Sequence, residues 1–314
     1  MYIKQVFNYK YDFWRYLVGV VLIVLGLTLG QIPWTVAVSL KNGTDLLGMT
    51  EMELMNSLDS NLNLFLLLLS FAIGLIALFI VVKKLHKQSL IALTTSRKKI
   101  DWSRCVFSFF ITALLIFAGI CLEYFLAPEN YEWNFNLGPF LILLVISLLL
   151  IPLQTSFEEY LFRGYLMQGI GAFVKNRWVP LLITSVVFGL LHFANPEVET
   201  FGKFIMVSYI GIGLLLGIIT LMDEGMELAL GFHAANNILI ALFVTSEFTA
   251  LQTHSVLKDI SVPEVLGWDV FIELLIVYPI ILGIFAKKYG WKNWGQKLFG
   301  KIEKPLPEVV TEEN

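Results

Sequence analysis

The sequence predicts an all-α, polytopic membrane protein with about eight transmembrane helices around a polar intramembrane cavity. The chain of 314 residues is 57% hydrophobic and only 15% charged, whereas a soluble globular domain has about 25% charged residues. Its mean hydropathy is +0.75. Apolar runs long enough to cross a bilayer recur along the whole chain. The short segments of alternating polarity that a membrane β-barrel requires do not appear.

Eight apolar segments are the predicted transmembrane helices. The fourth is predicted to continue as a helix to residue 174, which makes it about 55 Å long at about 1.5 Å per residue. Because a hydrocarbon core is about 30 Å thick, this helix must kink or protrude, and Pro152 is the natural kink. The predicted segments are approximately 13–39, 62–82, 103–126, 138–157, 178–194, 204–222, 226–245 and 269–286.

The first apolar run, Tyr16 to Leu29, follows three basic residues but lacks a small-residue cleavage site. We therefore expect a signal-anchor helix and no cleaved signal peptide. The next segment, 41–61, forms either a short interfacial amphipathic helix or a plain loop. Its apolar residues are Leu46, Leu47, Met52, Leu54, Met55 and Leu58.

Lysine and arginine residues set the predicted orientation, because cytoplasmic loops carry an excess of both. Of the 22 such residues, only Lys41, Lys203 and Lys258 fall in the predicted outer loops. The loops 41–61 and 123–136 are instead rich in Asp and Glu. Both termini are therefore predicted to be cytoplasmic, and the alternative is an inverted topology. The compact chain, which has no soluble extension, suggests a bacterial cytoplasmic membrane.

Two glutamates and an arginine follow the fourth apolar segment, where charge is costly. A charged side chain at the centre of a membrane helix costs roughly 2.5–3.5 kcal/mol on translocon scales. Glu159 and Arg163 are spaced i,i+4 and can pair, whereas Glu158 is rotated by about 100° and lacks a local partner. We therefore assign the pair to structure and Glu158 to acid–base chemistry. The alternative is that both glutamates lie solvated at the cytoplasmic surface.

His192 lies in the fifth apolar segment, four residues after Phe188. A lone histidine at such a position is either a hydrogen-bonded packing residue or a catalytic group. Lys175, in the predicted turn, lies 17 residues after Glu158 and 17 residues before His192. In an antiparallel hairpin the two side chains therefore lie at matching depth, each about 25 Å from the turn.

His233 and Asn237 are spaced i,i+4 in the seventh segment and share one helix face. Their side chains either donate two aligned hydrogen bonds to an oxyanion or act as polar glue between helices. The small residues Gly231, Ala234 and Ala235 allow another helix to approach closely, which suits both interpretations.

Other features give weaker signals. His86 and His254 fall in predicted loops, where we expect both to be solvated. Cys105 and Cys121 are 16 residues apart in one apolar segment, about 24 Å on a helix, so they cannot form an intrahelical disulfide. The net charge of -3 gives no indication of nucleic acid binding. Motifs of nucleotide hydrolases, zincins and serine hydrolases do not occur.

Taken together, the three motifs resemble the CPBP family of CAAX proteases and bacteriocin-processing proteins, also called the Abi family. The pattern of that family is E-E-x-x-x-R, then F-x-x-x-H, then H-x-x-x-N, on consecutive stretches of an eight-helix membrane domain. The resemblance covers roughly residues 138–245 of this chain. The matching residues, in order, are Glu158, Glu159, Arg163, Phe188, His192, His233 and Asn237.

The resemblance implies an intramembrane endopeptidase whose substrate is a membrane-associated peptide or protein. By position, Glu158 would activate water with help from His192. His233 and Asn237 would stabilise the tetrahedral oxyanion. Glu159 and Arg163 would hold the site together. We therefore expect an N-terminal helical region (residues 1–137) with an outer amphipathic loop, a catalytic core (138–245) that carries the resemblance, an outer loop with the last helix (246–304), and a short polar, disordered tail (305–314).

Zinc is the main chemical alternative, because the family is often described as metalloproteases. Glu158, His192 and His233 could supply one carboxylate and two imidazoles and leave a position for water. The two histidines are not spaced i,i+4 on one helix, however, and asparagine is a poor zinc ligand. We therefore expect a glutamate-activated water that needs no cofactor, with zinc as the alternative.

Two further functions stay open at this point. The first is a non-catalytic membrane immunity protein, or a scaffold that binds a peptide through the polar residues. The second is a small-solute transporter with an ionisable relay, although the inverted repeats expected of a transporter do not appear. The sequence does not identify the substrate or say whether it is prenylated.

Overall fold

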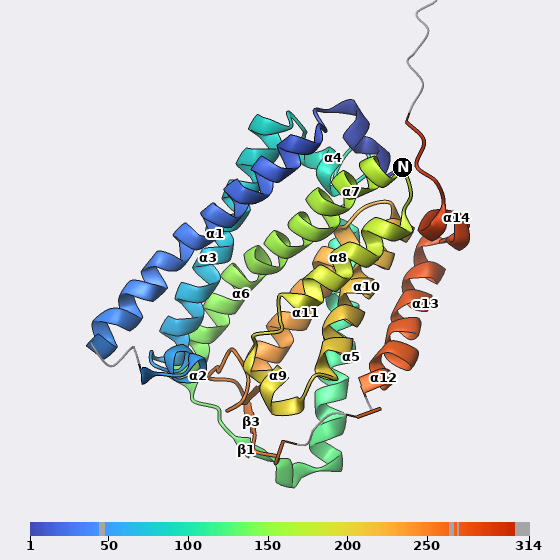
Figure 1. The fold of residues 1–314 in the computed structure, drawn as a ribbon. Helices are drawn as coiled ribbons and strands as arrows, with labels where there is room; N and C mark the ends of the chain where they lie inside the picture. Colours follow the sequence, from blue (N-terminus) through green and yellow to red (C-terminus); the bar gives the residue numbers. More distant parts are fainter. Residues whose placement is uncertain (44–47, 264–266, 269, 305–314) are drawn as a thin grey trace, which may run out of the picture.

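The computed structural model describes residues 1–43, 48–263, 267–268 and 270–304, and almost all of their regular structure is helical (Figure 1). Within these ranges, six helical stretches are long and apolar enough to span a membrane. The all-α polytopic membrane fold is therefore confirmed. The six stretches are Phe13–Asn42, Ser60–Leu85, Trp102–Leu126, Leu137–Val174, Ile205–Asp223 and Val270–Tyr289.

The other two predicted spans form shorter apolar helices, α8 (Trp178–Leu190) with 13 residues and α11 (Glu227–Phe243) with 17 residues. A helix needs about 20 residues to cross a bilayer. The eight predicted segments thus all correspond to helices, but a count of eight spanning helices is not confirmed.

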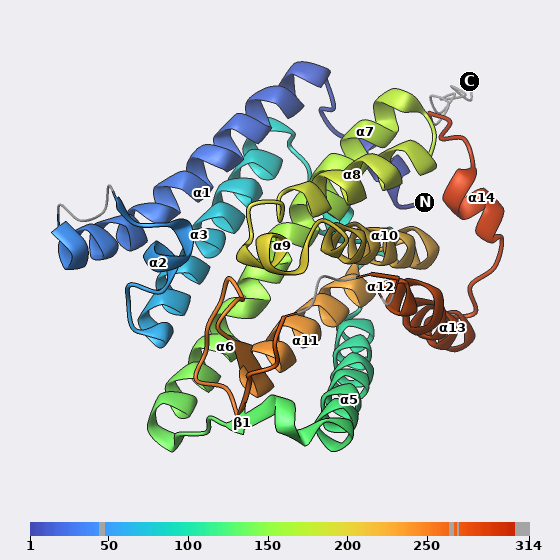
Figure 2. The ribbon, with the colours of Figure 1, turned by 60° about the horizontal axis from the view of Figure 1, so that its bottom comes forward.

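The bundle is built by consecutive pairwise packing. Helix α1 packs along α3, α3 along α6, α6 along α11, and α11 along α5, while α8 packs against α10. Figure 2 shows this order from the end that carries α9, with α6 and α11 in the interior. The helices named here are α1 (Phe13–Asn42), α3 (Ser60–Ile80), α5 (Trp102–Leu126), α6 (Leu137–Glu159), α9 (Pro196–Phe201) and α10 (Ile205–Asp223).

Short elements cover the two ends of the bundle. The N-terminal 3-10 helix η1 (Ile3–Asn8), α4 (Leu90–Thr94) and α14 (Trp294–Phe299) lie at one end (Figure 1). The opposite end carries α9 and a small sheet of strand order β1-β3-β2, in which β3 is antiparallel to β1 and parallel to β2. Its strands are β1 (Tyr131–Trp133), β2 (Val244–Ser246) and β3 (Leu257–Asp259).

The long fourth helix departs from α geometry after the two glutamates. Helix α6 passes through Pro152 and ends at Glu159. It continues as the π-helix η5 (Tyr160–Leu166) and then as α7 (Met167–Val174). Short π-helical segments occur frequently at functional sites. At the far end, α7 packs against η1, so the N-terminal segment covers the portion of this helix that exceeds a membrane thickness.

The segment 41–61 is only partly helical. Helix α2 covers Glu51–Met55. Leu46 and Leu47, which the amphipathic prediction includes, lie outside the described residues, and so does the side chain of Met52. The tail 305–314, predicted to be disordered, also lies outside them.

The prediction that His86 is solvated is wrong. The side chain is 1% exposed. Its Nδ1 lies 2.7 Å from the carbonyl oxygen of Lys10, and its Nε2 lies 2.9 Å from the hydroxyl of Tyr165. The imidazole is buried because the N-terminal segment folds back over the loop that follows α3. His254 is partly exposed, with its Nε2 3.6 Å from the carboxylate of Asp59.

Helices α5 and α11 approach closely at Gly231, as the small residues around His233 predict. A Cβ atom at this position would overlap the carbonyl group of Cys105 and contact the backbone nitrogen of Phe109. These are backbone atoms, which cannot move aside as a flexible side chain can. Only glycine therefore fits at this crossing, and the crossing fixes the position of α11 in the bundle.

We predict that Gly231→Ala destabilises the protein by about 1–3 kcal/mol, the usual cost of overpacking a well-packed site. The added methyl group would push α11 away from α5. Gly119→Ala is the matched control, because Gly119 lies in α5 and its added Cβ meets no atom within 4 Å. Thermal unfolding in detergent measures both variants. Equal midpoints for the two would contradict the close helix crossing.

Candidate active site

A chain of hydrogen-bonded polar side chains joins α6 to α11. At one end, Asn236 Nδ2 donates to Asn237 Oδ1 at 3.0 Å. Asn237 Nδ2 donates to Gln154 Oε1 at 3.1 Å. Gln154 Nε2 in turn donates to Glu158 Oε1 at 2.5 Å. Two helices therefore meet through one continuous set of amide and carboxylate groups.

The chain continues from Glu158 through the second glutamate. Glu158 Oε2 lies 3.5 Å from His233 Nε2, and His233 Nδ1 lies 2.9 Å from Glu159 Oε1. Arg163 Nη1 donates to the same Glu159 oxygen at 2.9 Å, and its Nη2 donates to the carbonyl of Gly213 in α10 at 2.9 Å. The i,i+4 pair Glu159–Arg163 is therefore formed, and Glu159 also holds His233.

Burial divides the polar chain into two groups. Glu159 and Arg163 are 0% exposed, and His233 is 3% exposed. Glu158, Gln154 and the two asparagines are half-buried. Glu159 and Arg163 can only support and orient other side chains, whereas a substrate and water can reach the half-buried residues. His233 lies between the two groups, with its Nε2 facing Glu158.

Phe188, the aromatic residue of the second motif, packs between the charged and imidazole groups. The guanidinium carbon of Arg163 lies 4.7 Å from the centre of the Phe188 ring, in a cation–π arrangement. The ring centre is also 5.0 Å from that of His192 and 6.1 Å from that of His233. This aromatic ring therefore links α8 to the buried ion pair and to both histidines.

His192 lies just beyond the last residue of α8. Its Nδ1 is 2.9 Å from the carbonyl oxygen of Phe188, so Nδ1 carries the donated hydrogen. Its ring stacks on Tyr209 of α10, with ring centres 4.5 Å apart and planes inclined by 20°. Nε2 is thus a free acceptor, with no hydrogen-bond partner among the described residues.

The histidine that contacts Glu158 is His233. The antiparallel hairpin instead predicts His192 at the depth of Glu158. Within the described ranges, no hydrogen bond or ion pair joins Glu158 to His192. The side chain of Phe188, which belongs to α8, contacts both imidazoles. The match in depth across the hairpin does not by itself bring the two side chains into contact.

Three residues outside the predicted set take part in the site: Gln154, Tyr209 and Asn236, which helix geometry predicts to point away from the face shared by His233 and Asn237. Of these, Gln154 carries a usable signal, because it lies one helical turn before Glu158 on the same face of α6. Asn236 and Tyr209 enter through contacts that depend on the final packing.

The residues present do not form a metal site in this arrangement. Zinc would need three protein ligands and an open position. Among the described residues, no group of three or more His, Cys, Asp or Glu side chains is placed to hold a metal ion. Of the three candidate ligands, Glu158 and His233 lie 3.5 Å apart, but among the described residues no hydrogen bond or ion pair joins His192 to either of them. We therefore derive no step through zinc.

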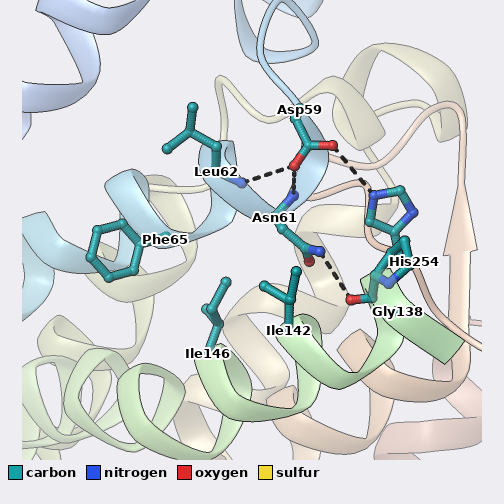
Figure 3. Close-up of a pocket in the computed structure, with 9 residues that line it drawn as sticks. Asp59, Asn61, Leu62, Phe65, Gly138, Ile142, Ile146 and His254 are labelled. Atoms are coloured by element: carbon teal, nitrogen blue, oxygen red, sulfur yellow. Dashed lines mark hydrogen bonds and ion pairs between the residues drawn. The ribbon is translucent and has the colours of Figure 1, made fainter.

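The cavity drawn in Figure 3 lies away from the polar chain. It has a volume of about 740 Å³ and opens between the first turns of α3 and α6. Asn61 Nδ2 donates to the Pro139 carbonyl at 2.9 Å on its wall. It contains no residue of the polar chain and does not define the site. Its lining residues are Asp59, Asn61, Leu62, Phe65, Gly138, Pro139, Ile142, Ile146 and His254.

We predict that Arg163→Met destabilises the protein by about 3–5 kcal/mol, because it leaves the buried Glu159 carboxylate without its cation. The double substitution Glu159→Gln/Arg163→Met removes both charges and should recover a large fraction of that loss. Thermal unfolding in detergent compares the variants. A double variant less stable than Arg163→Met would contradict the view that the unpaired carboxylate causes the damage.

Comparison with known proteins agrees with the resemblance seen in the motifs. Residues 137–239 match the family model described as type II CAAX prenyl endopeptidase Rce1-like. YyaK of Bacillus subtilis (strain 168), described as an uncharacterized protein, is 32% identical over 190 residues. That alignment covers 60% of this chain and 64% of the relative, so the match spans less than two thirds of the relative's length. No solved structure matches.

The matched range begins with the first residue of α6 and ends within α11. It therefore contains the half-buried carboxylate, the buried ion pair, both imidazoles and Asn237. The family is one of membrane proteases. By the family-model match and the three motifs, residues 137–239 of this chain are similar to the Rce1-like type II CAAX prenyl endopeptidases, consistent with the CPBP family.

Proposed function

We propose that this protein is an intramembrane endopeptidase of the CPBP type that hydrolyses a peptide bond in a membrane-associated peptide or protein. The observation that carries the proposal is the unequal burial of the two adjacent glutamates. Glu159 is fully buried and paired with Arg163. Glu158 stays half-buried, with one oxygen bound by an amide and the other facing an imidazole.

Glu158 is the proposed general base. Its carboxylate accepts a proton from a water molecule as the water oxygen attacks the carbonyl carbon of the scissile peptide bond. The carbonyl oxygen then becomes the tetrahedral oxyanion. The proton passes to the leaving nitrogen as the C–N bond breaks, which yields a carboxylic acid and an amine.

His233 and Asn237 are the proposed oxyanion donors. Nδ1 of His233 is held by Glu159, so Nε2 is the ring atom that faces the half-buried side of the site. A carboxylate behind an imidazole fixes the ring orientation and stabilises the charged ring when a proton is taken up. Asn237 Nδ2 has two hydrogens, and only one is donated to Gln154. The second is free to meet the oxyanion.

His192 is the proposed assistant of the base. Its Nδ1 is bound to a main-chain carbonyl and its ring is stacked, so the free Nε2 has a fixed direction. Such an acceptor can bind and orient the attacking water. Phe188, which contacts both rings, would keep the two imidazoles apart.

We also propose that both termini face the cytoplasm of a bacterial cell. The segment between α3 and α5, which includes α4, lies at the end of the bundle that carries η1 and α14 (Figure 1). This segment contains five exposed lysines. These lysines are Lys83, Lys84, Lys87, Lys98 and Lys99. An excess of cations at one end is the usual mark of the cytoplasmic side.

We predict that Glu158→Gln lowers peptide cleavage by about 100- to 10,000-fold, the usual contribution of a general base, while thermal unfolding stays close to wild type. Glu199→Gln is the matched control, because Glu199 is an exposed glutamate of α9 outside the site. Purified protein is incubated with a peptide library and the products are identified by mass spectrometry. Undiminished cleavage by Glu158→Gln would overturn the assignment. Peptide binding by wild type without cleavage would favour a scaffold protein.

We predict that a zinc chelator leaves the rate of cleavage essentially unchanged, because the site residues do not form a ligand set. The same purified protein is assayed after prolonged incubation with chelator and again after zinc is restored. Loss of cleavage in chelator followed by recovery with zinc would show that Glu158, His192 and His233 rearrange around a metal ion.

A further inference from the structure

We propose that Gln154 is a positioning residue that holds the Glu158 carboxylate and the Asn237 amide in a fixed relation. The inference rests on the proposed function and adds to it a residue outside the three motifs. Gln154 does not itself meet the reacting atoms in this proposal. It acts through the base on α6 and the oxyanion donor on α11.

The two hydrogen bonds of Gln154 use the two ends of one rigid group. Its Nε2 donates to Glu158 Oε1 at 2.5 Å, and its Oε1 accepts from Asn237 Nδ2 at 3.1 Å. A primary amide can donate at one end and accept at the other, and its plane fixes the angle between the two bonds. A glutamate here would offer acceptors only, and a methionine would replace neither bond.

Gln154 makes one of very few polar connections between these helices. Among the described residues, the side chains of α11 that hydrogen-bond or ion-pair to α6 are His233 and Asn237. His233 binds the glutamate pair, and Asn237 binds Gln154. Without Gln154, Asn237 would therefore have no side-chain bond to the helix that carries the base.

The same bond also decides which way the Asn237 amide points. Asn236 Nδ2 donates to Asn237 Oδ1 at 3.0 Å, and Asn237 Nδ2 donates to Gln154. The amide is therefore held at both ends and cannot rotate freely. One N–H remains for an oxyanion in a fixed direction, which is the preorganisation that makes such donors effective.

The expected consequence of losing Gln154 is a loss of kcat with little change in KM. The base and the oxyanion donor would remain, but their relative position would vary. A misplacement of about 1 Å in reacting groups can reduce the rate about 100-fold. Substrate binding, which uses other regions of the substrate, should change little.

The test compares Gln154→Met and Gln154→Glu with wild type, alone and combined with Asn237→Ala. Both single substitutions keep the approximate length of the side chain, and each is expected to lower kcat about 100-fold. In the Asn237→Ala background the further loss should be smaller, because one of the two residues that Gln154 holds in a fixed relation is already gone. Ser147→Ala is the control, since Ser147 lies two turns before Gln154 on α6 and has no side-chain partner among the described residues.

Thermal unfolding of the same two double-mutant cycles, one for each substitution of Gln154 with Asn237→Ala, supplies a readout that does not depend on activity. A non-additive midpoint together with a non-additive kcat supports the inference. Additive losses in kcat, with wild type active and Glu158→Gln inactive, overturn the positioning role and leave the proposed function intact. If wild type cleaves no peptide, the proposed function and this inference are both overturned, even where the unfolding midpoints of the cycle are non-additive.

Discussion

The ion pair between Glu159 and Arg163 is the constraint on which the arrangement of the site depends. Both side chains are fully buried, and a buried ion is tolerated only when it is paired and hydrogen-bonded. Beyond the pair itself, Arg163 contacts the Gly213 carbonyl of α10 and the face of Phe188 in α8, and Glu159 contacts His233 of α11. Arg163 Nε and Glu159 Oε2 have no hydrogen-bond partner among the described residues. One pair on a single helical stretch therefore determines where three neighbouring helices must lie.

The positions of the half-buried groups depend on this buried ion pair. His233 is held at Nδ1 by the buried carboxylate, so its other nitrogen faces Glu158. The adjacent glutamates can take such different environments because they point about 100° apart on the helix. The π-helical turn that follows Glu159 includes Arg163. A rigid support and an accessible carboxylate thus come from neighbouring positions, which explains why a doubled glutamate is useful at this point in the chain.

Much of the fold and some of the site could be predicted from the sequence, because both rest on local rules. Apolar length located the helices, and i,i+4 spacing identified the Glu159–Arg163 pair. The contact of Glu158 with His233 could not be read in the same way, since hairpin counting gives depth along a helix but not rotation toward a third helix. His86 was wrongly expected in solvent because the distant N-terminal segment buries it. Gln154 contacts Asn237 across 83 residues, and only tertiary packing sets that contact.

The shortness of α8 bears on how water reaches the site. A helix of 13 residues is about 20 Å long, so a chain that enters at the membrane surface leaves helical geometry inside a core about 30 Å thick. Non-helical backbone at that depth is tolerated only where protein buries it or where it lines a water-filled space. His192 lies in this turn, half-buried, with its Nε2 free. The end of α8 therefore lies at the place in the bundle where the proposed mechanism needs an activated water.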